Sequence, residues 1–179
     1  MPDLVEKIVA VHEALKTADL PHAFGGALAL AWCTERARGT IDIDVNIFVP
    51  VASHQSIIEA MPEDVRVRKQ DLKVLKRDGQ VRIWWDKTPL DLFLNTTEFH
   101  NEVAKRIRWE MFGGTAVPFL SCSDLAVFKV FFNRTRDWAD IEAMHAADNL
   151  DVSQVRATIA RHMGDDDERI ARLDALQRG

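Results

Sequence analysis

The stretch of residues 22–49 constrains the fold of this chain more than any other. A short apolar run leads into the pair Gly25-Gly26, and residues 26–36 then have the composition of a buried helix. Residues 41–49 alternate apolar and polar side chains, which is the period of a strand with one solvated face. This order predicts a strand–helix–strand unit that turns at a glycine pair.

Two carboxylates are predicted to project from one face of the second strand. Asp42 and Asp44 are separated by one residue, and side chains at i and i+2 of a strand point the same way, about 6–7 Å apart. Such a pair repels itself unless a cation lies between the carboxylates, and hard oxygen ligands suit Mg²⁺. Upstream, the glycine pair would let a phosphate approach backbone amides at a helix N-terminus. Together these features predict a nucleotide site, whereas an isolated D-x-D is more often the solvated face of an edge strand.

A third aspartate lies in a later apolar run. Residues 90–94 read Leu-Asp-Leu-Phe-Leu and follow a strand predicted at 80–85 and a turn predicted at Lys87-Thr88-Pro89. A carboxylate among leucines is costly unless it is paired or bound to metal. Asp91 is therefore the predicted third ligand beside Asp42 and Asp44, provided that the strands are neighbours. The alternative is an aspartate on an edge strand near a turn.

The remaining elements follow hydrophobic periodicity and capping signals. Asp3 is a predicted helix N-cap, and Ser121-x-x-Asp124 resembles a capping box. After Ser121 the pattern is helical to the end of the chain. The helices predicted outside the strand–helix–strand unit are 3–17, 52–60, 98–105, 123–133, 134–147, 152–162 and 166–177. Short strands are predicted at 22–24, 65–69, 107–112 and 115–120, and a glycine turn at Gly113-Gly114 joins the last two into a hairpin.

Composition narrows the function classes. The formal net charge of −5 argues against a protein that coats nucleic acid, because non-specific affinity comes from neutralised phosphates. A local basic patch remains as a candidate, with a solvated mixed-charge surface as the alternative. The patch consists of Arg66, Arg68, Lys69, Lys73, Lys76, Arg77 and Arg82.

Targeting and cysteine signals indicate a cytoplasmic protein. No apolar run approaches the about 20 residues that span a bilayer, and the N-terminus has no signal-peptide pattern. Cys33 and Cys122 have neither C-x-x-C spacing nor a histidine pattern, so they are predicted to be reduced, buried thiols.

One lysine stands out in the apolar helix predicted at 123–133. Lys129 either extends its ammonium to the surface or aims it at a phosphate. Further along, Asp137 and Asp140 share a helix face close to Arg134 and Arg136. Local ion pairing explains these four residues as well as a functional role does.

Taken together, these motifs resemble the nucleotidyltransferases of the DNA polymerase beta superfamily. More narrowly, they resemble the abortive-infection (AbiEii-like) branch and its toxin relatives, with antibiotic nucleotidyltransferases as cousins. The resembling residues run from 20 to 145 and comprise Gly25-Gly26-Ala27-Leu28-Ala29-Leu30, Arg38-x-Thr40-x-Asp42-x-Asp44, L-D-L-F-L around Asp91, S-D-L-A-V-F-K ending at Lys129, and R-x-R-D-W-x-D-I-E from Arg134. Two departures are Gly-Gly where many members have Gly-Ser, and a long gap between Gly26 and Asp42.

The resemblance implies a fold and a domain organisation. The expected class is α/β (α+β), a nucleotidyltransferase-fold mixed sheet flanked by helices. Residues 1–120 would form this core, and residues 121–179 a helical C-terminal region packed on it. The helices after about residue 150 match nothing in the family pattern.

The resemblance also implies a two-metal site for phosphoryl transfer. Asp42 and Asp44 would bind the Mg²⁺ that carries the triphosphate, and Asp91 with both would bind a second Mg²⁺ and help to deprotonate the attacking hydroxyl. The substrate would be an NTP such as ATP, with pyrophosphate as the leaving group. The implied phosphate contacts are the amides of Gly25 and Gly26 with the side chains of Arg38, Thr40 and Lys129, and Asp137 would orient Lys129 or the nucleotide.

The acceptor and the class of protein stay open. An RNA 3′ end such as that of tRNA fits the toxin relatives and the basic patch, whereas a small hydroxylated molecule fits the acidic net charge. A second class is a degenerate, non-catalytic member that binds nucleotide or a partner. A third is an interaction module whose C-terminal helices dock a cognate antitoxin.

Overall fold

The computed structural model describes residues 1–36 and 39–178. The chain forms two compact units. The first consists of Met1–Leu28 and Gly39–Leu120, and the second of Ala29–Arg38 and Ser121–Gly179.

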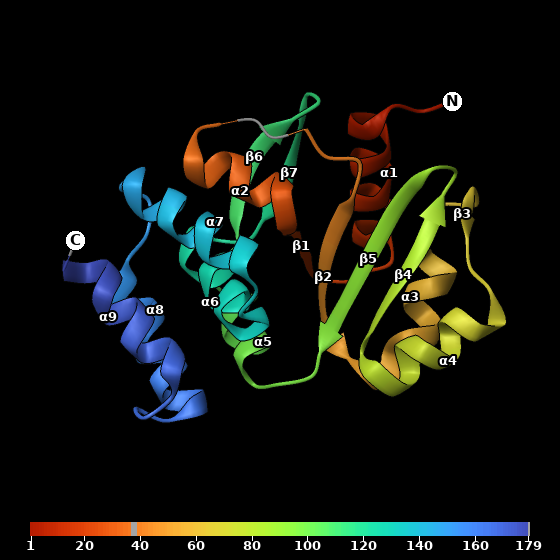
Figure 1. The fold of residues 1–179 in the computed structure, drawn as a ribbon. Coiled ribbons are helices and arrows are strands. Elements are labelled where there is room, and N and C mark those ends of the chain that lie inside the picture. The colour runs from red at the N-terminus through yellow and green to blue at the C-terminus, as the bar shows by residue number, and fades with distance from the viewer. Residues whose placement is uncertain (37–38, 179) are drawn as a thin grey trace. The chain divides into compact units, whose positions relative to one another are not determined.

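A mixed sheet organises the first unit (Figure 1). In the described residues it has seven strands, in the order β3-β4-β5-β2-β1-β7-β6. The parallel pair β2–β5 lies at its centre, with antiparallel β4 beside β5 and antiparallel β1 beside β2. The strands are β1 (His22–Phe24), β2 (Ile43–Pro50), β3 (Val65–Arg66), β4 (Gln80–Trp85), β5 (Thr88–Asn95), β6 (Arg108–Phe112) and β7 (Thr115–Phe119).

Alternation along the central strands separates a buried face from the face that carries the aspartates. Leu90, Leu92 and Leu94 of β5 are buried on one face, whereas Asp91 and Phe93 point to the other. The helices α1, α3 and α4 lie behind β2, β5 and β4 in Figure 1. The helices of the first unit are α1 (Leu4–Thr17), α3 (His54–Ala60), α4 (Lys69–Asp78) and α5 (Phe99–Val103), with a 3₁₀ turn at Val51–Ser53.

Contacts made by α1 identify the face of the sheet that this helix covers. The buried ammonium of Lys7 donates to the Trp85 carbonyl and to the Thr88 hydroxyl at the turn between β4 and β5, and it lies over the Trp85 ring. Asp3 caps this helix in a reciprocal capping box with Glu6, which confirms the predicted N-cap. Because Arg82 is three residues from Trp85 in β4, it points to the opposite face.

The helix α4 was not predicted. Residues 65–69 were expected as a strand, but the strand ends at Arg66 and a helix begins at Lys69. The helix contains few apolar residues, and the clearest local indications of a helix lie at its two ends. Asp71 accepts hydrogen bonds from the Arg68 backbone and guanidinium, and Gly79 closes the helix in the left-handed region.

The second unit is helical. The helix α2 (Gly26–Thr34) begins in the first unit and ends in the second, where the chain returns at Ser121. Ser121 caps α6 by accepting from the Asp124 amide, as predicted. The helices α6 (Cys122–Phe132), α7 (Thr135–Ala146), α8 (Val152–Met163) and α9 (Glu168–Arg178) pack in the pairs α6–α7, α6–α8 and α8–α9. Among the described helices, none combines the length and the apolar composition required of a membrane span.

The two cysteines correct a prediction. Cys33 at the end of α2 and Cys122 at the start of α6 form a disulfide, so they are not the reduced thiols expected from the sequence. Spacing could not reveal this bond, because the two residues are 89 positions apart and meet only when α2 and α6 pack. Beside the bond, the Asn149 side chain donates to the Cys33 carbonyl.

Candidate active site

The register of the central strands brings the predicted aspartates together. Asp44 in β2 lies directly beside Asp91 in β5, because the two strands are parallel and paired from Ile43–Leu90 to Ile47–Leu94. Both side chains therefore point to the same face, which we call the site face. The condition placed on Asp91 by the sequence, that its strand should neighbour the first, is met.

Asp42 belongs to the same cluster but not to the strand. The strand β2 begins at Ile43 rather than at the predicted residue 41, so Asp42 lies in the preceding loop. The Thr40 hydroxyl accepts a hydrogen bond from the Asp42 amide at 3.1 Å and lies 3.4 Å from the Asp42 carbonyl oxygen. Thr40, which was predicted to contact phosphate, thus holds the backbone of a site aspartate.

An arginine connects two of these carboxylates. Arg82 in β4 is the register partner of Asp91 across the β4–β5 hairpin. Its Nε and Nη2 donate to the two carboxylate oxygens of Asp91 at 2.8 and 2.6 Å, a bidentate pair. The same Nη2 lies 3.5 Å from Oδ2 of Asp42.

The cluster is partly exposed and electrostatically coupled. The Asp91 side chain is 17% exposed, Asp42 40% and Arg82 48%. The hydrogen bonds to Asp91 raise the pKa of Arg82 above its ordinary value, and the negative charges of Asp91, Asp42 and Asp44 raise it further against the opposing effect of burial. Arg82 is therefore a permanent cation among three acids.

The glycine pair forms the other wall of this cluster. Gly26 opens α2 with φ of +54°, and a Cβ at this position would overlap the carboxylate of Asp44. Only glycine allows that approach. The amide of Gly25 donates to the Asp44 carbonyl at 2.9 Å. The Gly25 amide is therefore already hydrogen-bonded to β2. Of the two amides predicted to contact phosphate, only that of Gly26, at the helix N-terminus, stays a prediction.

The carboxylate oxygens of the cluster are of the type that binds a hard divalent cation, but they are placed around Arg82 rather than around a metal position. Carboxylate oxygens are the ligands that Mg²⁺ prefers, and a cation, the Arg82 guanidinium, is already held by Asp91 and Asp42. Over the part of the chain that the structure describes, no group of three or more His, Cys, Asp or Glu side chains is gathered tightly enough to hold a metal ion. The carboxylates are arranged around the guanidinium instead.

The other predicted phosphate contacts lie in the second unit or outside the described residues. Arg38 falls among the residues that the structure does not describe. The Lys129 ammonium is 2.7 Å from Asp140 and 3.8 Å from Asp137, and its side chain is 11% exposed. Instead of reaching the surface, this ammonium is paired with acids inside the helical unit. Asp137 is hydrogen-bonded mainly to Arg134, whose amide and guanidinium both donate to its carboxylate.

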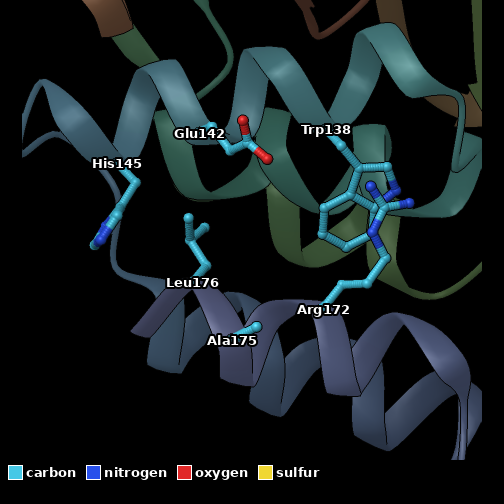
Figure 2. Close-up of a pocket in the computed structure, with 6 residues that line it drawn as sticks. All are labelled: Trp138, Glu142, His145, Arg172, Ala175 and Leu176. Carbon is cyan, nitrogen blue, oxygen red and sulfur yellow. The ribbon is translucent and has the colours of Figure 1, made fainter. Parts of the chain in front are cut away.

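A pocket of about 370 Å³ also lies in the second unit, between α7 and α9 (Figure 2). The Arg172 guanidinium lies over the Trp138 ring, 4.0 Å from its centroid. The lining residues are Trp138, Glu142, His145, Arg172, Ala175 and Leu176. None of the predicted site residues is among them.

Arg82 is the site residue that sequence reasoning did not assign. It was counted in a basic patch, although a two-residue turn at Asp86-Lys87 would have placed it opposite Asp91. The sequence predicted the turn one residue later, at Lys87-Thr88-Pro89, and the register was lost with it. Asp86 adopts φ of +53°, which non-glycine residues rarely do outside such turns.

The mixed sheet, the flanking helices and the paired aspartates define the class of fold. It is the α/β nucleotidyltransferase fold, as predicted, since solved nucleotidyltransferase structures superpose on the chain over most of its length. No family model matches the sequence, and no curated protein matches it either.

Three solved structures illustrate the likeness. The solution structure of the antibiotic-resistance factor ANT(2″)-Ia covers 97% of this chain and 95% of its own, with 14% identity and a TM-score of 0.59. The crystal structure of ANT(2″)-Ia with adenylyl-2″-tobramycin covers 88% and 98%, with 15% identity and a TM-score of 0.61. The lincomycin-bound lincosamide antibiotic adenylyltransferase LnuA covers 79% and 96%, with 11% identity and a TM-score of 0.53. At these identities the likeness establishes the fold.

Proposed function

We propose that this protein is an Mg²⁺-dependent enzyme that transfers a nucleoside monophosphate from an NTP to a hydroxyl acceptor. One observation carries the proposal. Asp44 and Asp91 lie side by side in register on adjacent parallel strands, and Arg82 pairs with both Asp91 and Asp42. The closeness of Gly26 to the Asp44 carboxylate places a helix N-terminus at the same spot.

The residues divide the work as follows. Asp42 and Asp44 would hold the Mg²⁺ that accompanies the triphosphate, and Asp91 with both would hold a second. Bound Mg²⁺ would neutralise the triphosphate and stabilise the attacking and leaving oxygens. Asp91 would accept the proton of the acceptor hydroxyl as its oxygen bonds to the α-phosphorus and the bond to pyrophosphate breaks.

Two acceptor classes remain, and the structure informs both. The basic patch is divided, because Arg68 and Arg77 pair with neighbouring aspartates and Arg82 lies in the site. Lys69, Lys73 and Lys76 form an exposed stripe on α4 that could follow an RNA backbone. The solved relatives with antibiotic ligands support a small hydroxylated acceptor, since adenylyl-tobramycin and lincomycin are bound in two of them.

An aromatic side chain beside the site suits either acceptor. Trp84 is two residues from Arg82 in β4, points to the site face and is 40% exposed. A ring or a base could stack on it. Replacing Trp84 by alanine is expected to raise KM for the acceptor and to leave KM for the NTP unchanged.

A labelled-transfer assay tests the proposal. Purified protein with Mg²⁺ and each α-labelled NTP is incubated with tRNA and, separately, with aminoglycosides and lincosamides. We expect label to pass to one acceptor class, and Asp91→Asn to lower the rate by about 100-fold or more, the contribution of a general base. Asp64→Asn, at an exposed aspartate outside the cluster, serves as the matched control.

Two outcomes would count against this function. Absence of transfer from every NTP to every acceptor would favour the degenerate, nucleotide-binding alternative. Unchanged transfer by Asp42→Asn and Asp91→Asn would place the chemistry elsewhere in the molecule.

The finer hypothesis is a toxin of the abortive-infection branch with a cognate antitoxin. It is supported by the motif series from Gly25 to Glu142. Expression of the wild type in bacteria should then arrest growth, whereas Asp42→Asn at equal protein level should not. Equal growth of the two strains would reject the toxin role without affecting the transferase assay.

A further inference from the structure

We propose that Arg82 is a built-in counter-ion that occupies the second cation position of the site and leaves it when the nucleotide arrives. The inference rests on the proposed function, because it concerns the metal site of that function. Arg82 would thus be a positioning residue that couples filling of this position to substrate binding.

The geometry points to this role. Each oxygen of Asp91 accepts a hydrogen bond from the guanidinium, at 2.8 and 2.6 Å, so a metal ion on this carboxylate would have to share it with a positive group. Nη2 is the shared atom, since it also lies 3.5 Å from Asp42. A single positive group therefore stands between the two carboxylates that a bridging cation would join.

The positive charge of Arg82 opposes a second cation at the same place. A metal ion bound to Asp91 and Asp42 would lie beside the guanidinium, and like charges at such distances repel strongly outside bulk water. Metal binding there therefore becomes more favourable when the triphosphate adds negative charge or when Arg82 withdraws.

The arginine is also free to move in a way that the buried ion pairs are not. Its side chain is 48% exposed on the site face, whereas the Lys129 side chain in the second unit is 11% exposed. Because the guanidinium is about half exposed, exchanging this ion pair for one with a phosphate costs less than breaking a buried pair. A planar guanidinium released from Asp91 would suit a triphosphate or pyrophosphate oxygen pair.

Metal binding without nucleotide tests the proposal directly. Mn²⁺ binding is measured by electron paramagnetic resonance of the free ion, and Mg²⁺ binding by calorimetry. The proteins are the wild type, Arg82→Met and Arg82→Lys. Arg77→Met is the matched control, because Arg77 is also paired with an aspartate, Asp78, but lies on α4.

Arg82→Met should bind one ion more than the wild type, or bind metal on the order of ten-fold more tightly, which is the effect of removing one adjacent positive charge. Arg82→Lys keeps the charge but loses the bidentate hydrogen bonds, so its metal binding should lie between that of the wild type and that of Arg82→Met. Arg77→Met should match the wild type.

The results separate this inference from the function on which it rests. Equal stoichiometry and affinity for Arg82→Met and wild type, both folded by circular dichroism and both active in transfer, would overturn the role of Arg82 alone. Failure of every variant to bind Mn²⁺, with or without an NTP, would overturn the proposed function itself. Should Arg82→Met not fold, Arg82→Lys carries the comparison, and affinity equal to that of the wild type would refute the inference.

Discussion

Replacement of Gly26 by alanine isolates the contact between the diglycine turn and the site. Gly26 has φ of +54°, and a Cβ there would overlap the carboxylate of Asp44. The left-handed backbone alone costs an L-residue about 1 kcal/mol. The overlap cannot be relieved by a small shift, so the Asp44 side chain must leave its rotamer or the start of α2 must move.

The consequence for activity should exceed the consequence for stability. Displacement of a metal-holding carboxylate by about 1 Å lowers a rate by about 100-fold. We therefore expect Gly26→Ala to lose about 1–2 kcal/mol in urea unfolding. Mn²⁺ affinity should fall at least ten-fold, and the labelled-transfer rate about 100-fold.

Gly114→Ala is the matched control for this experiment. Gly114 has φ of +80° in the turn between β6 and β7, and a Cβ there would meet no atom within 4 Å. It imposes a similar backbone penalty without the overlap, so it should lose stability and keep metal binding and transfer. Full metal binding and transfer by Gly26→Ala would show that Asp44 is not placed by this contact and would refute the reasoning.

Three further predictions concern stability. Burial lowers the pKa of His22 to about 4 from 6.5, so below pH 6.5 the unfolded chain takes up a proton more readily than the folded protein. The free energy of unfolding should therefore keep its full value above pH 6.5 and fall by about 3 kcal/mol towards pH 4. In urea unfolding, His22→Gln should show a smaller fall. The disulfide between Cys33 and Cys122 closes a loop of 89 positions, so its reduction should lower the free energy of unfolding by about 4 kcal/mol. Thiol titration of the denatured protein should find no thiols before reduction and two after it. Lys129→Met removes the cation 2.7 Å from the buried Asp140 and should cost about 3 kcal/mol in urea unfolding; unchanged stability would show that the pair does not hold α6 to α7.

Periodicity predicted the parts of this fold whose side chains alternate clearly. The strand β4 was predicted at its observed bounds, 80–85, because Val81, Ile83 and Trp85 are buried while their neighbours are exposed. The cap at Asp3 and the glycine turn between β6 and β7 were also predicted, since each rests on a local hydrogen bond or a local backbone conformation. Such features need no knowledge of the rest of the chain.

What escaped prediction depends on residues that are distant in sequence. The disulfide requires that α2 and α6 pack together, and neither cysteine carries a local sign of it. The helix α4 presents a mostly charged surface, and its identity depends on burial of Leu75 under the neighbouring elements. Its helical period rests on only three apolar residues, Leu72, Val74 and Leu75, and no helix was predicted from them.

The aspartate site shows both situations in one place. Asp44 and Asp91 could be related from sequence because Asp44 lies with Asp42 on the polar face of an alternating strand, and Asp91 interrupts an apolar strand, where a carboxylate needs a partner. Arg82 could not be assigned in the same way, because an arginine on a half-exposed strand is common and its meaning comes from the register of the β4–β5 hairpin. Arg82 therefore appeared in the sequence only as a member of a basic patch. The register pairs it with Asp91, where we propose that it competes with a metal ion, and for that reason metal binding by Arg82→Met is a more informative experiment than removal of an aspartate.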